Sequence, residues 1–143
     1  MRDRPILDQV NLVVRDMPAM VDFYRSLGLD IEDPPPPWDA HHRSVKMSEG
    51  ADLDLDSGTF ATRWNQGWRA EDSGAVLGFR VVQRTSVDAL YTQLTDAGHV
   101  GRQQPYDAFW GARYALVEDP DGNTIGIMSE VDASRRTRPP SPE

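Results

Sequence analysis

A row of three carboxylates is the most concentrated set of charged side chains in the sequence. Asp52, Asp54 and Asp56 alternate with apolar residues over a short segment. Successive side chains of a strand point to opposite faces, so on a strand these three would share one face. Such a row must be solvated or matched by a cation. It is either the wet edge of a sheet or a surface that binds a basic ligand.

Aromatic side chains gather in segments that we expect to be loops. Trp64 and Trp68 lie four residues apart, which on a helical turn places them on one side. The other members of this group are Trp38, Phe60, Tyr106, Phe109 and Trp110. Planar ligands stack on such rings, and cations bind over their faces for about 0.5–2 kcal/mol. Each ring could instead close the end of a small core, but the group as a whole favours a ligand pocket.

Sequence motifs of known catalytic sites are missing. The chain has no cysteine, which excludes disulfides and thiolate chemistry, and it has no Ser-His-Asp order, nucleophile elbow or glycine-rich phosphate loop. Adjacent residues on a strand face opposite sides, so His41 and His42 would not act together, and His99 follows a helix end. We interpret all three as surface residues. Asp54 in an apolar surround would have a raised pKa and could act as a base.

Composition and charge limit the function classes. The 143 residues, 38% hydrophobic and 27% charged, indicate one soluble globular domain. The net charge of −8 disfavours nucleic acids and anionic membranes as partners, because both would be repelled. No apolar run approaches the roughly 18 residues of a membrane span, and the N-terminus lacks the apolar region of a secretory signal. We therefore expect a cytoplasmic protein.

The elements that must position these residues form two similar halves. In the first half we predict a strand at 7–14, a helix at 17–27 and a hairpin of strands at 43–48 and 51–57. After an irregular aromatic segment at 60–69 and a loop at 71–74, the second half has a strand at 76–82, a helix at 86–97 and strands at 100–104, 113–118 and 123–129. Thr85 and Asp88 resemble a capping box for the second helix.

Apolar positions correspond between the halves in the same element order. The first strands match at Val10, Leu12 and Val14 against Leu77, Phe79 and Val81. Chance matching would not preserve the order of elements. The repeat predicts an α+β fold of paired β-α-β-β-β modules, at about residues 6–57 and 75–129, within a single domain of residues 1–132. Residues 133–143, rich in Arg, Ser and Pro, are predicted to be a disordered tail.

With this repeat, the chain resembles the vicinal oxygen chelate superfamily of glyoxalases, bleomycin-resistance proteins and extradiol dioxygenases. The segments that carry the resemblance are residues 7–16, Phe23-Tyr24, Leu27-Gly28-Leu29, Trp110-Gly111-Ala112-Arg113 and Asp119-Pro120-Asp121-Gly122-Asn123. The resemblance implies curved half-barrel sheets around a cavity, commonly in a homodimer. A homodimer would also cover the open edges of the sheets.

The resemblance also implies where metal ligands would lie. In the superfamily they are usually His and Glu on the first and last strands of each module, positions that here hold Gln9, Asp54, Val76 and Gly126. Valine and glycine have no donor side chain, whereas catalytic metal sites need about three protein ligands. We therefore predict that the metal site has been lost, with no metal, no other cofactor and no assigned catalytic residue.

These positions mark the cavity face of each strand and give a set of predicted ligand-binding residues. The set is Gln9, Asn11, Trp38, Asp52, Asp54, Asp56, Phe60, Trp64, Trp68, Arg80, Tyr106, Phe109, Trp110 and Met128. Arg80 could pair with one of the aspartates, which would weaken the attraction for a cationic ligand.

The sequence thus favours a small-molecule-binding homodimer that sequesters a planar ligand, with a cationic one favoured by the aspartates, as antibiotic-resistance members of the superfamily do. The alternative is a glyoxalase- or dioxygenase-like enzyme that is metal-independent or uses an unconventional metal site. Enzymatic activity stays open, with the balance against it. The identity of the ligand cannot be read from the sequence.

Overall fold

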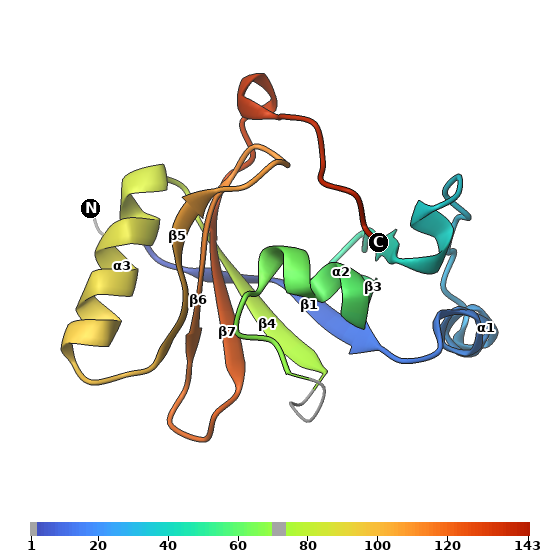
Figure 1. Cartoon of the computed structure of the whole chain (residues 1–143), viewed down its shortest axis with the longest axis horizontal. Coiled ribbons are helices and arrows are strands. Elements are labelled where there is room, and N and C mark those ends of the chain that lie inside the picture. The colour runs from blue at the N-terminus through green and yellow to red at the C-terminus, as the bar shows by residue number, and fades with distance from the viewer. Residues whose placement is uncertain (1–2, 70–73) are drawn as a thin grey trace.

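A single curved sheet of seven strands forms the framework of the computed structural model, which describes residues 3–69 and 74–143 (Figure 1). The strands are β1 (Ile6–Val14), β2 (His42–Val45), β3 (Asp52–Ser57), β4 (Ala75–Val81), β5 (Gly101–Asp107), β6 (Arg113–Glu118) and β7 (Thr124–Ser129), in the sheet order β2-β3-β1-β4-β7-β6-β5. The helices are α1 (Met17–Leu27), α2 (Gly58–Trp64) and α3 (Arg84–Asp96), with 3₁₀ turns η1 (Trp38–Ala40) and η2 (Ala133–Arg135). No helix among the described residues is both long and apolar enough to cross a bilayer.

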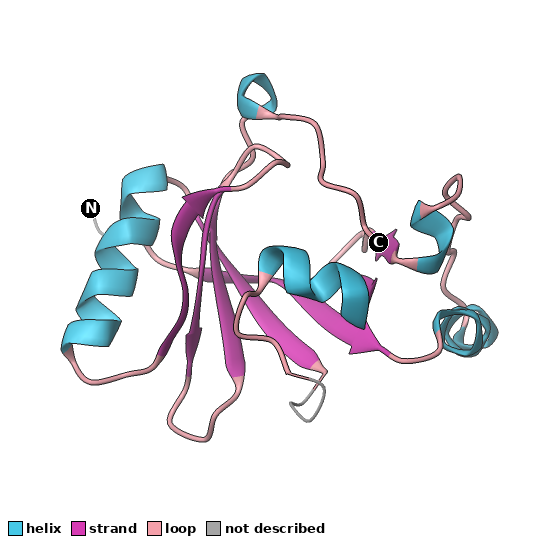
Figure 2. Ribbon diagram, in the orientation of Figure 1, coloured by secondary structure: helices cyan, strands magenta, loops and turns pink. Residues whose placement is uncertain are grey.

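The predicted α+β fold with a curved, unclosed sheet is confirmed (Figure 2). β1 and β4 pair antiparallel at the centre of the sheet, so the two modules pair within one chain. The second module has the expected order of strand, helix and three strands, but the first has only β2 and β3 after α1. The proline run at 34–37 lies where a third strand would be, and proline has no N–H to donate to a sheet.

Local end signals explain α1 but not α3. The Asp16 side chain accepts a hydrogen bond from a first-turn N–H of α1, and Gly28 ends that helix at φ 115°. The expected cap at Thr85 does not form, because α3 begins at Arg84, two residues earlier than predicted, and has no side-chain cap within its own segment. Asp3 instead accepts hydrogen bonds from two backbone N–H groups before the helix and from the hydroxyl of Ser86. This cap comes from the far end of the chain, where no local pattern indicates it.

The segment between the modules also differs from expectation. Residues 58–64 form the helix α2, capped by the Ser57 hydroxyl, where the sequence indicates an irregular segment with at most one helical turn. The loop expected at 71–74 lies, apart from Gly74, outside the described residues.

Three hydrophobic clusters hold the sheet, and one of them is shared between the modules. The cluster that packs α1 on the first module consists of Val14, Met17, Val21, Ile31, Val45 and Leu55. The cluster that packs α3 on the second module consists of Val81, Val87, Ala115, Val117 and Ile127. The shared cluster consists of Phe60, Ala61, Trp64, Val76 and Leu116, with further aromatic rings packed against it.

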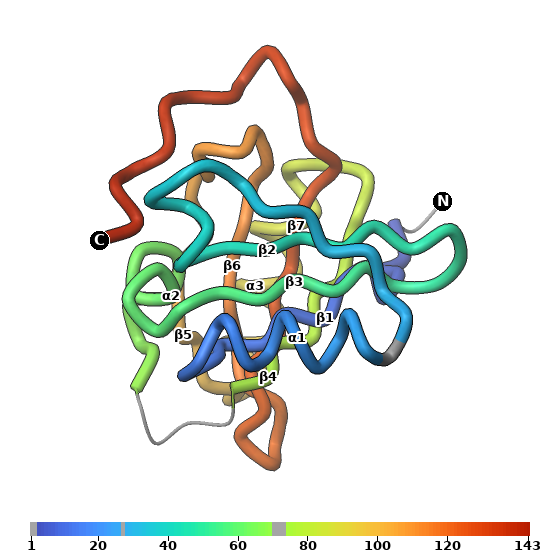
Figure 3. The backbone as a smooth tube through the Cα atoms, turned by 90° about the vertical axis from the view of Figure 1, so that its right-hand side faces the viewer, coloured from blue at the N-terminus to red at the C-terminus, as the bar shows by residue number. Residues whose placement is uncertain are grey.

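The tail at 133–143, for which composition predicts disorder, has defined positions in the structure. It leaves the end of β7, forms η2 and crosses toward the side of the molecule that carries α2 (Figures 1 and 3). Backbone hydrogen bonds to the turn before β6 fix its course, from Asp132 N to Gly111 O and from Thr137 N to Phe109 O. Composition does not reveal such anchors, because they are made by backbone groups.

Replacing Leu55 with alanine tests the first core. Leu55 is fully buried, whereas Leu7 is 47% exposed and serves as a control of the same residue type. Leu55→Ala should lower the free energy of unfolding by about 2–5 kcal/mol through lost burial and a residual cavity. Leu7→Ala should cost less than about 1 kcal/mol. Urea denaturation followed by circular dichroism measures both, and equal losses would contradict the placement of Leu55 in the core.

Candidate functional site

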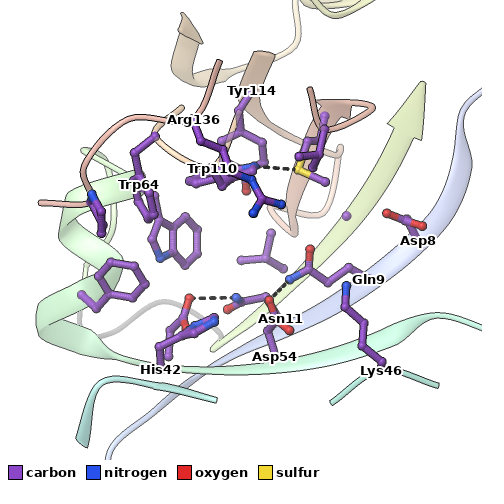
Figure 4. A pocket seen from close by; sticks show the side chains of 18 of the residues that line it. Asp8, Gln9, Asn11, His42, Lys46, Asp54, Trp64, Trp110, Tyr114 and Arg136 are labelled. Carbon is purple, nitrogen blue, oxygen red and sulfur yellow. Dashed lines mark hydrogen bonds and ion pairs between the residues drawn. The ribbon is translucent and has the colours of Figure 1, made fainter. Parts of the chain in front are cut away.

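A cavity of about 470 Å³ lies between the two modules, over the middle of the sheet (Figure 4). β1, β2 and β3 supply its polar side, β4 adds apolar residues, and η1, α2 and the turn before β6 supply aromatic rings. Its volume falls in the range of roughly 300–1,000 Å³ that small-molecule sites occupy.

Most of the residues predicted to bind a ligand lie together around this cavity. They are Gln9, Asn11, Trp38, Asp54, Asp56, Phe60, Trp64, Phe109, Trp110 and Met128. Strand alternation accounts for the polar ones, because β1 and β3 run parallel with Asn11 opposite Asp54. The aromatic ones come from three separate segments and meet only in the folded chain.

Two charged residues of the predicted set, Asp52 and Arg80, lie outside the cavity lining. Asp52 sits at the start of β3, where it accepts from a backbone N–H and pairs with Lys46 at 3.1 Å. Arg80 pairs with Asp8 and Glu130, both at 3.3 Å, and not with the aspartates of β3. Arg80 therefore does not neutralise Asp54 or Asp56, although it does pair with Asp8, which lines the cavity.

Two aromatic residues of the predicted set also lie outside the lining. Trp68 packs its ring over Gly58, where a Cβ would lie 3.0 Å from the indole. Tyr106 donates its hydroxyl to the backbone carbonyl of Trp64 at 3.3 Å and packs edge-to-face on Tyr114. Both support the wall from behind, as the core-closing interpretation of these rings predicts.

The polar side of the cavity is a set of carboxylates held by amides of the neighbouring strand. The Gln9 side-chain amide donates to Asp54, and the Asn11 amide donates to Asp56 at 2.9 Å. His42 Nδ1 lies 2.5 Å from the other carboxylate oxygen of Asp56. Asp56 as a residue is 2% exposed. Asp56 thus has a partner on each side, one from β1 and one from β2.

His42 is the main residue of the site that sequence reasoning missed. The sequence predicts a surface residue, whereas His42 lines the cavity and its ring contacts Trp38 and Phe60 edge-on. The missed signal is hairpin register, because β2 and β3 pair antiparallel with His42 directly opposite Asp56. Further lining residues outside the predicted set are Asp8, Lys46, Val76, Gly78, Phe79, Tyr114, Val131, Arg136 and Pro139.

Burial dominates the electrostatics of the cavity. It raises the pKa of Asp54 to about 6, against the lowering effects of His42 charge and the Ser44 hydrogen bond. Burial also opposes charge on His42, but the hydrogen bond and charge of Asp56 outweigh it and raise the His42 pKa above its ordinary value. Asp54 therefore titrates close to neutral pH, and the neighbouring Asp56 favours the charged form of His42.

The aromatic side of the cavity is a chain of edge-to-face contacts. Trp38 meets Phe60 at 5.0 Å between ring centroids, and Trp110 meets Phe109 at 5.1 Å and Tyr114 at 5.2 Å. Edge-to-face pairs hold rings in fixed orientations, so this wall is preorganised.

Two buried polar atoms of the lining lack a hydrogen-bond partner within the described residues. They are the side-chain oxygen of Asn11 and the indole nitrogen of Trp64. One is an acceptor and the other a donor, and an unpaired buried polar group costs about 1–3 kcal/mol.

The positions that resemble metal ligands do not form a donor set. Gln9 commits its amide nitrogen to Asp54, and Val76 has no donor atom. A Cβ at Gly126 would lie 2.9 Å from the Tyr114 hydroxyl, so the tyrosine ring fills the space that a ligand side chain would need. Among the described residues no three His, Asp or Glu side chains are grouped to hold a metal ion. These residues do not fit the metal site of the superfamily.

The raised pKa of Asp54 predicts how stability depends on pH. With a pKa of about 6 in the folded state and about 3.9 unfolded, the native state binds more protons between these values, so stability falls as pH rises through them. Asp54→Asn removes this penalty. The difference in free energy of unfolding between the variant and the wild type should therefore be more favourable to the variant at pH 7.5 than at pH 4.5, by up to roughly 2–3 kcal/mol.

Urea unfolding at the two pH values measures this gain. Asp52→Asn is the matched control, because hydrogen bonds from Met47 and Lys46 outweigh burial and lower the Asp52 pKa. The control should show no gain at pH 7.5. An Asp54→Asn variant with the same pH dependence as the wild type would contradict the burial of this charge.

Solved structures share this fold at low sequence identity. The chain is similar to a glyoxalase/bleomycin resistance protein/dioxygenase superfamily member from Vibrio splendidus 12B01 (12% identity, 89% of this chain and 100% of that chain, TM-score 0.59). It is also similar to the NAD-dependent benzaldehyde dehydrogenase from Legionella pneumophila (20% identity, 85% and 96%, TM-score 0.60). Homoprotocatechuate 2,3-dioxygenase from Arthrobacter globiformis matches at 18% identity and TM-score 0.64, with 91% of this chain but 37% of that chain covered. At these identities the likeness shows the fold alone.

Sequence comparison identifies the family more directly than these structures do. No curated protein matches the chain in sequence. The model of the Glyoxalase/Bleomycin resistance protein/Dioxygenase superfamily matches residues 6–127, which is most of the chain and includes both modules. The chain therefore belongs to the glyoxalase/bleomycin resistance protein/dioxygenase superfamily.

Proposed function

We propose that the protein binds a planar, cationic small molecule in the cavity between its modules, without a metal. The observation that carries this proposal is the opposition of an aromatic wall and buried carboxylates across one cavity of about 470 Å³. Superfamily membership is compatible with binding and with catalysis, so the proposal depends on the site.

The aromatic side favours a flat ligand. Rings from three separate segments line the cavity, among them Trp38, Phe60, Trp64 and Trp110. Ring faces attract both planar π-systems and cations, with aromatic pairs contributing about 0.5–1.5 kcal/mol beyond the area they bury. An aliphatic ligand of the same volume would leave this geometry unused.

The polar side favours a ligand with positive charge and N–H donors. Asp54 and Asp56 line the cavity and are negatively charged acceptors. Lys46, one of the cations of the lining, has a side chain that is 83% exposed and pairs with Asp52. The net charge of −8 would also attract a cationic ligand over longer range.

A metal-independent enzyme is the second candidate, and the pair of His42 and Asp56 favours it. Asp56 binds His42 at Nδ1, which leaves Nε2 as the ring nitrogen that can accept a proton at the cavity. An oriented histidine of this kind serves as a general base in many enzymes. Recovery of a chemically changed ligand after incubation would favour this candidate, and recovery of the intact ligand favours sequestration of the antibiotic-resistance type.

Binding of matched small aromatic compounds tests the proposed function. 4-Aminobenzamidine is a planar cation, and 4-aminobenzamide is its neutral counterpart of the same shape. Isothermal titration should show the amidine binding at least about tenfold more tightly than the amide, because a charge about 6 Å from Asp54 is worth roughly 2–3 kcal/mol before desolvation and about half that net.

Two variants locate the site for this measurement. Asp54→Asn keeps the shape of the side chain and should weaken amidine binding about tenfold. Asp121→Asn changes an exposed carboxylate on the turn between β6 and β7 and should leave binding unchanged. Equal affinity of the amidine and the amide would overturn the cationic part of the proposal, and equal affinity of both variants would place the pocket elsewhere.

We also propose that the protein is a cytoplasmic homodimer. β2 and β5 are the edge strands of the sheet, and exposed apolar side chains lie on its elements at Ile6, Leu77 and Val82. An unpaired edge and exposed apolar groups are the features that a second copy of the chain would cover. Sedimentation velocity at tens of micromolar should give the mass of two chains, and a single monomer boundary would refute the dimer.

A further inference from the structure

The C-terminal tail lies across the mouth of the cavity that the proposed function uses. Val131, Arg136 and Pro139 belong to the cavity lining, although they follow the last strand. The tail rises from the end of β7 and returns toward α2 and β2, so it spans from one module to the other (Figures 1 and 3). The tail is thus part of the site.

The tail is attached on the near side by backbone contacts that require a glycine. Asp132 N donates to Gly111 O at 2.9 Å, and Thr137 N donates to Phe109 O at 3.0 Å. Gly111 has φ 97°, and a Cβ there would lie 2.4 Å from the Asp132 carbonyl oxygen. Only glycine accepts both this conformation and this close approach.

The tail is attached on the far side by side-chain contacts with Glu143. The Arg63 guanidinium of α2 donates to the Glu143 backbone carbonyl at 2.6 Å. His41 Nε2 lies 3.4 Å from the Glu143 carboxylate. Pro142 is buried although its neighbours are exposed. Exposed contacts of this type are individually weak, so the far side can open at little cost.

Arg136 is the residue that the tail holds over the cavity. Its guanidinium points into the cavity, toward the side that carries Gln9 and Asn11 (Figure 4). No ion pair involves Arg136 in the part of the chain that the structure describes. A guanidinium is planar, permanently charged and able to stack on aromatic rings. It therefore has the chemistry that the proposed function assigns to the ligand.

We propose that the tail is a tethered competitor, in which Arg136 lies over the cavity and obstructs the approach of a cation to its carboxylates until an aromatic amidine or guanidine displaces it. This inference rests on the proposed function and adds to it the ligand class and its regulation. The opposite role, in which Arg136 binds an anionic group of the ligand, fits less well. An anion drawn toward Arg136 would face Asp54, Asp56 and the unpaired Asn11 oxygen.

A tethered group competes with a free ligand through its effective concentration, which for a short connection is in the millimolar range. Removing the group therefore raises the apparent affinity of the ligand without adding a contact. Arg136→Ala should bind 4-aminobenzamidine about three- to tenfold more tightly than the wild type in isothermal titration. Arg138→Ala is the matched control, because it removes the same charge from the tail outside the cavity lining, and it should leave the affinity unchanged.

The anionic analogue 4-aminobenzoate separates the two possible roles of Arg136. If Arg136 is a competitor of the ligand, Arg136→Ala should not weaken benzoate binding. If Arg136 is a receptor for an anionic ligand, the same variant should abolish benzoate binding and leave amidine binding unchanged. The second result would overturn the inference. Equal amidine affinity in wild type, Arg136→Ala and Arg138→Ala would overturn it while the proposed function stands. Absence of amidine binding in all three would overturn both.

Tail displacement can be measured without reference to affinity. Because the chain has no cysteine, Ser141→Cys gives a single site for a nitroxide spin label on the exposed part of the tail. Saturating 4-aminobenzamidine should shorten the rotational correlation time of the label toward the value measured in an Arg63→Ala background, where the far attachment is lost. An unchanged correlation time at saturation would show that ligand and tail occupy the site together, and would overturn the inference.

Discussion

The antiparallel pairing of β1 with β4 is the interaction on which the rest of the structure depends. It joins two modules, each with a helix and a core of its own, into one curved sheet within a single chain. Neither module could form the cavity alone, because its polar side comes mainly from the first module and much of its aromatic wall from the second. The shared cluster around Val76 and Leu116 closes the space between them and keeps the cavity dry on one side.

Within this frame, side chains of a different chemistry stand where the superfamily places its metal ligands. Val76 and Gly126 have no donor atoms, and Tyr114 fills the space beside Gly126. Asp54 and Asp56 are matched by neutral amides and by one histidine, so the site keeps buried negative charge. Buried charge of this kind is costly unless it is paired, and a cationic ligand would supply the missing partner. The same arrangement gives His42 the orientation of a general base, so binding and catalysis would use the same residues.

The tail adds a second level of control to such a site. A pocket that is rich in aromatic rings and carboxylates would bind many organic cations. A covalently attached guanidinium at its mouth would lower the apparent affinity of the pocket for all of them, so that only ligands with better stacking or charge pairing displace it. The position of Gly111 beneath Asp132 shows that the turn before β6 accommodates the tail.

Local patterns in the sequence determined what depends on neighbouring residues. Asp16 and Gly28 delimit α1, alternation places Asp54 and Asp56 on one face, and the repeated apolar pattern predicts the two modules. The tertiary structure alone decided the rest. The pairing of His42 with Asp56 depends on hairpin register. The capping of α3 by Asp3 depends on contact between residues some eighty positions apart, and the position of Arg136 depends on backbone hydrogen bonds to a distant turn. Register and long-range contacts leave no periodic signal, because a one-residue shift in pairing moves every side chain to the opposite face while the sequence pattern stays the same.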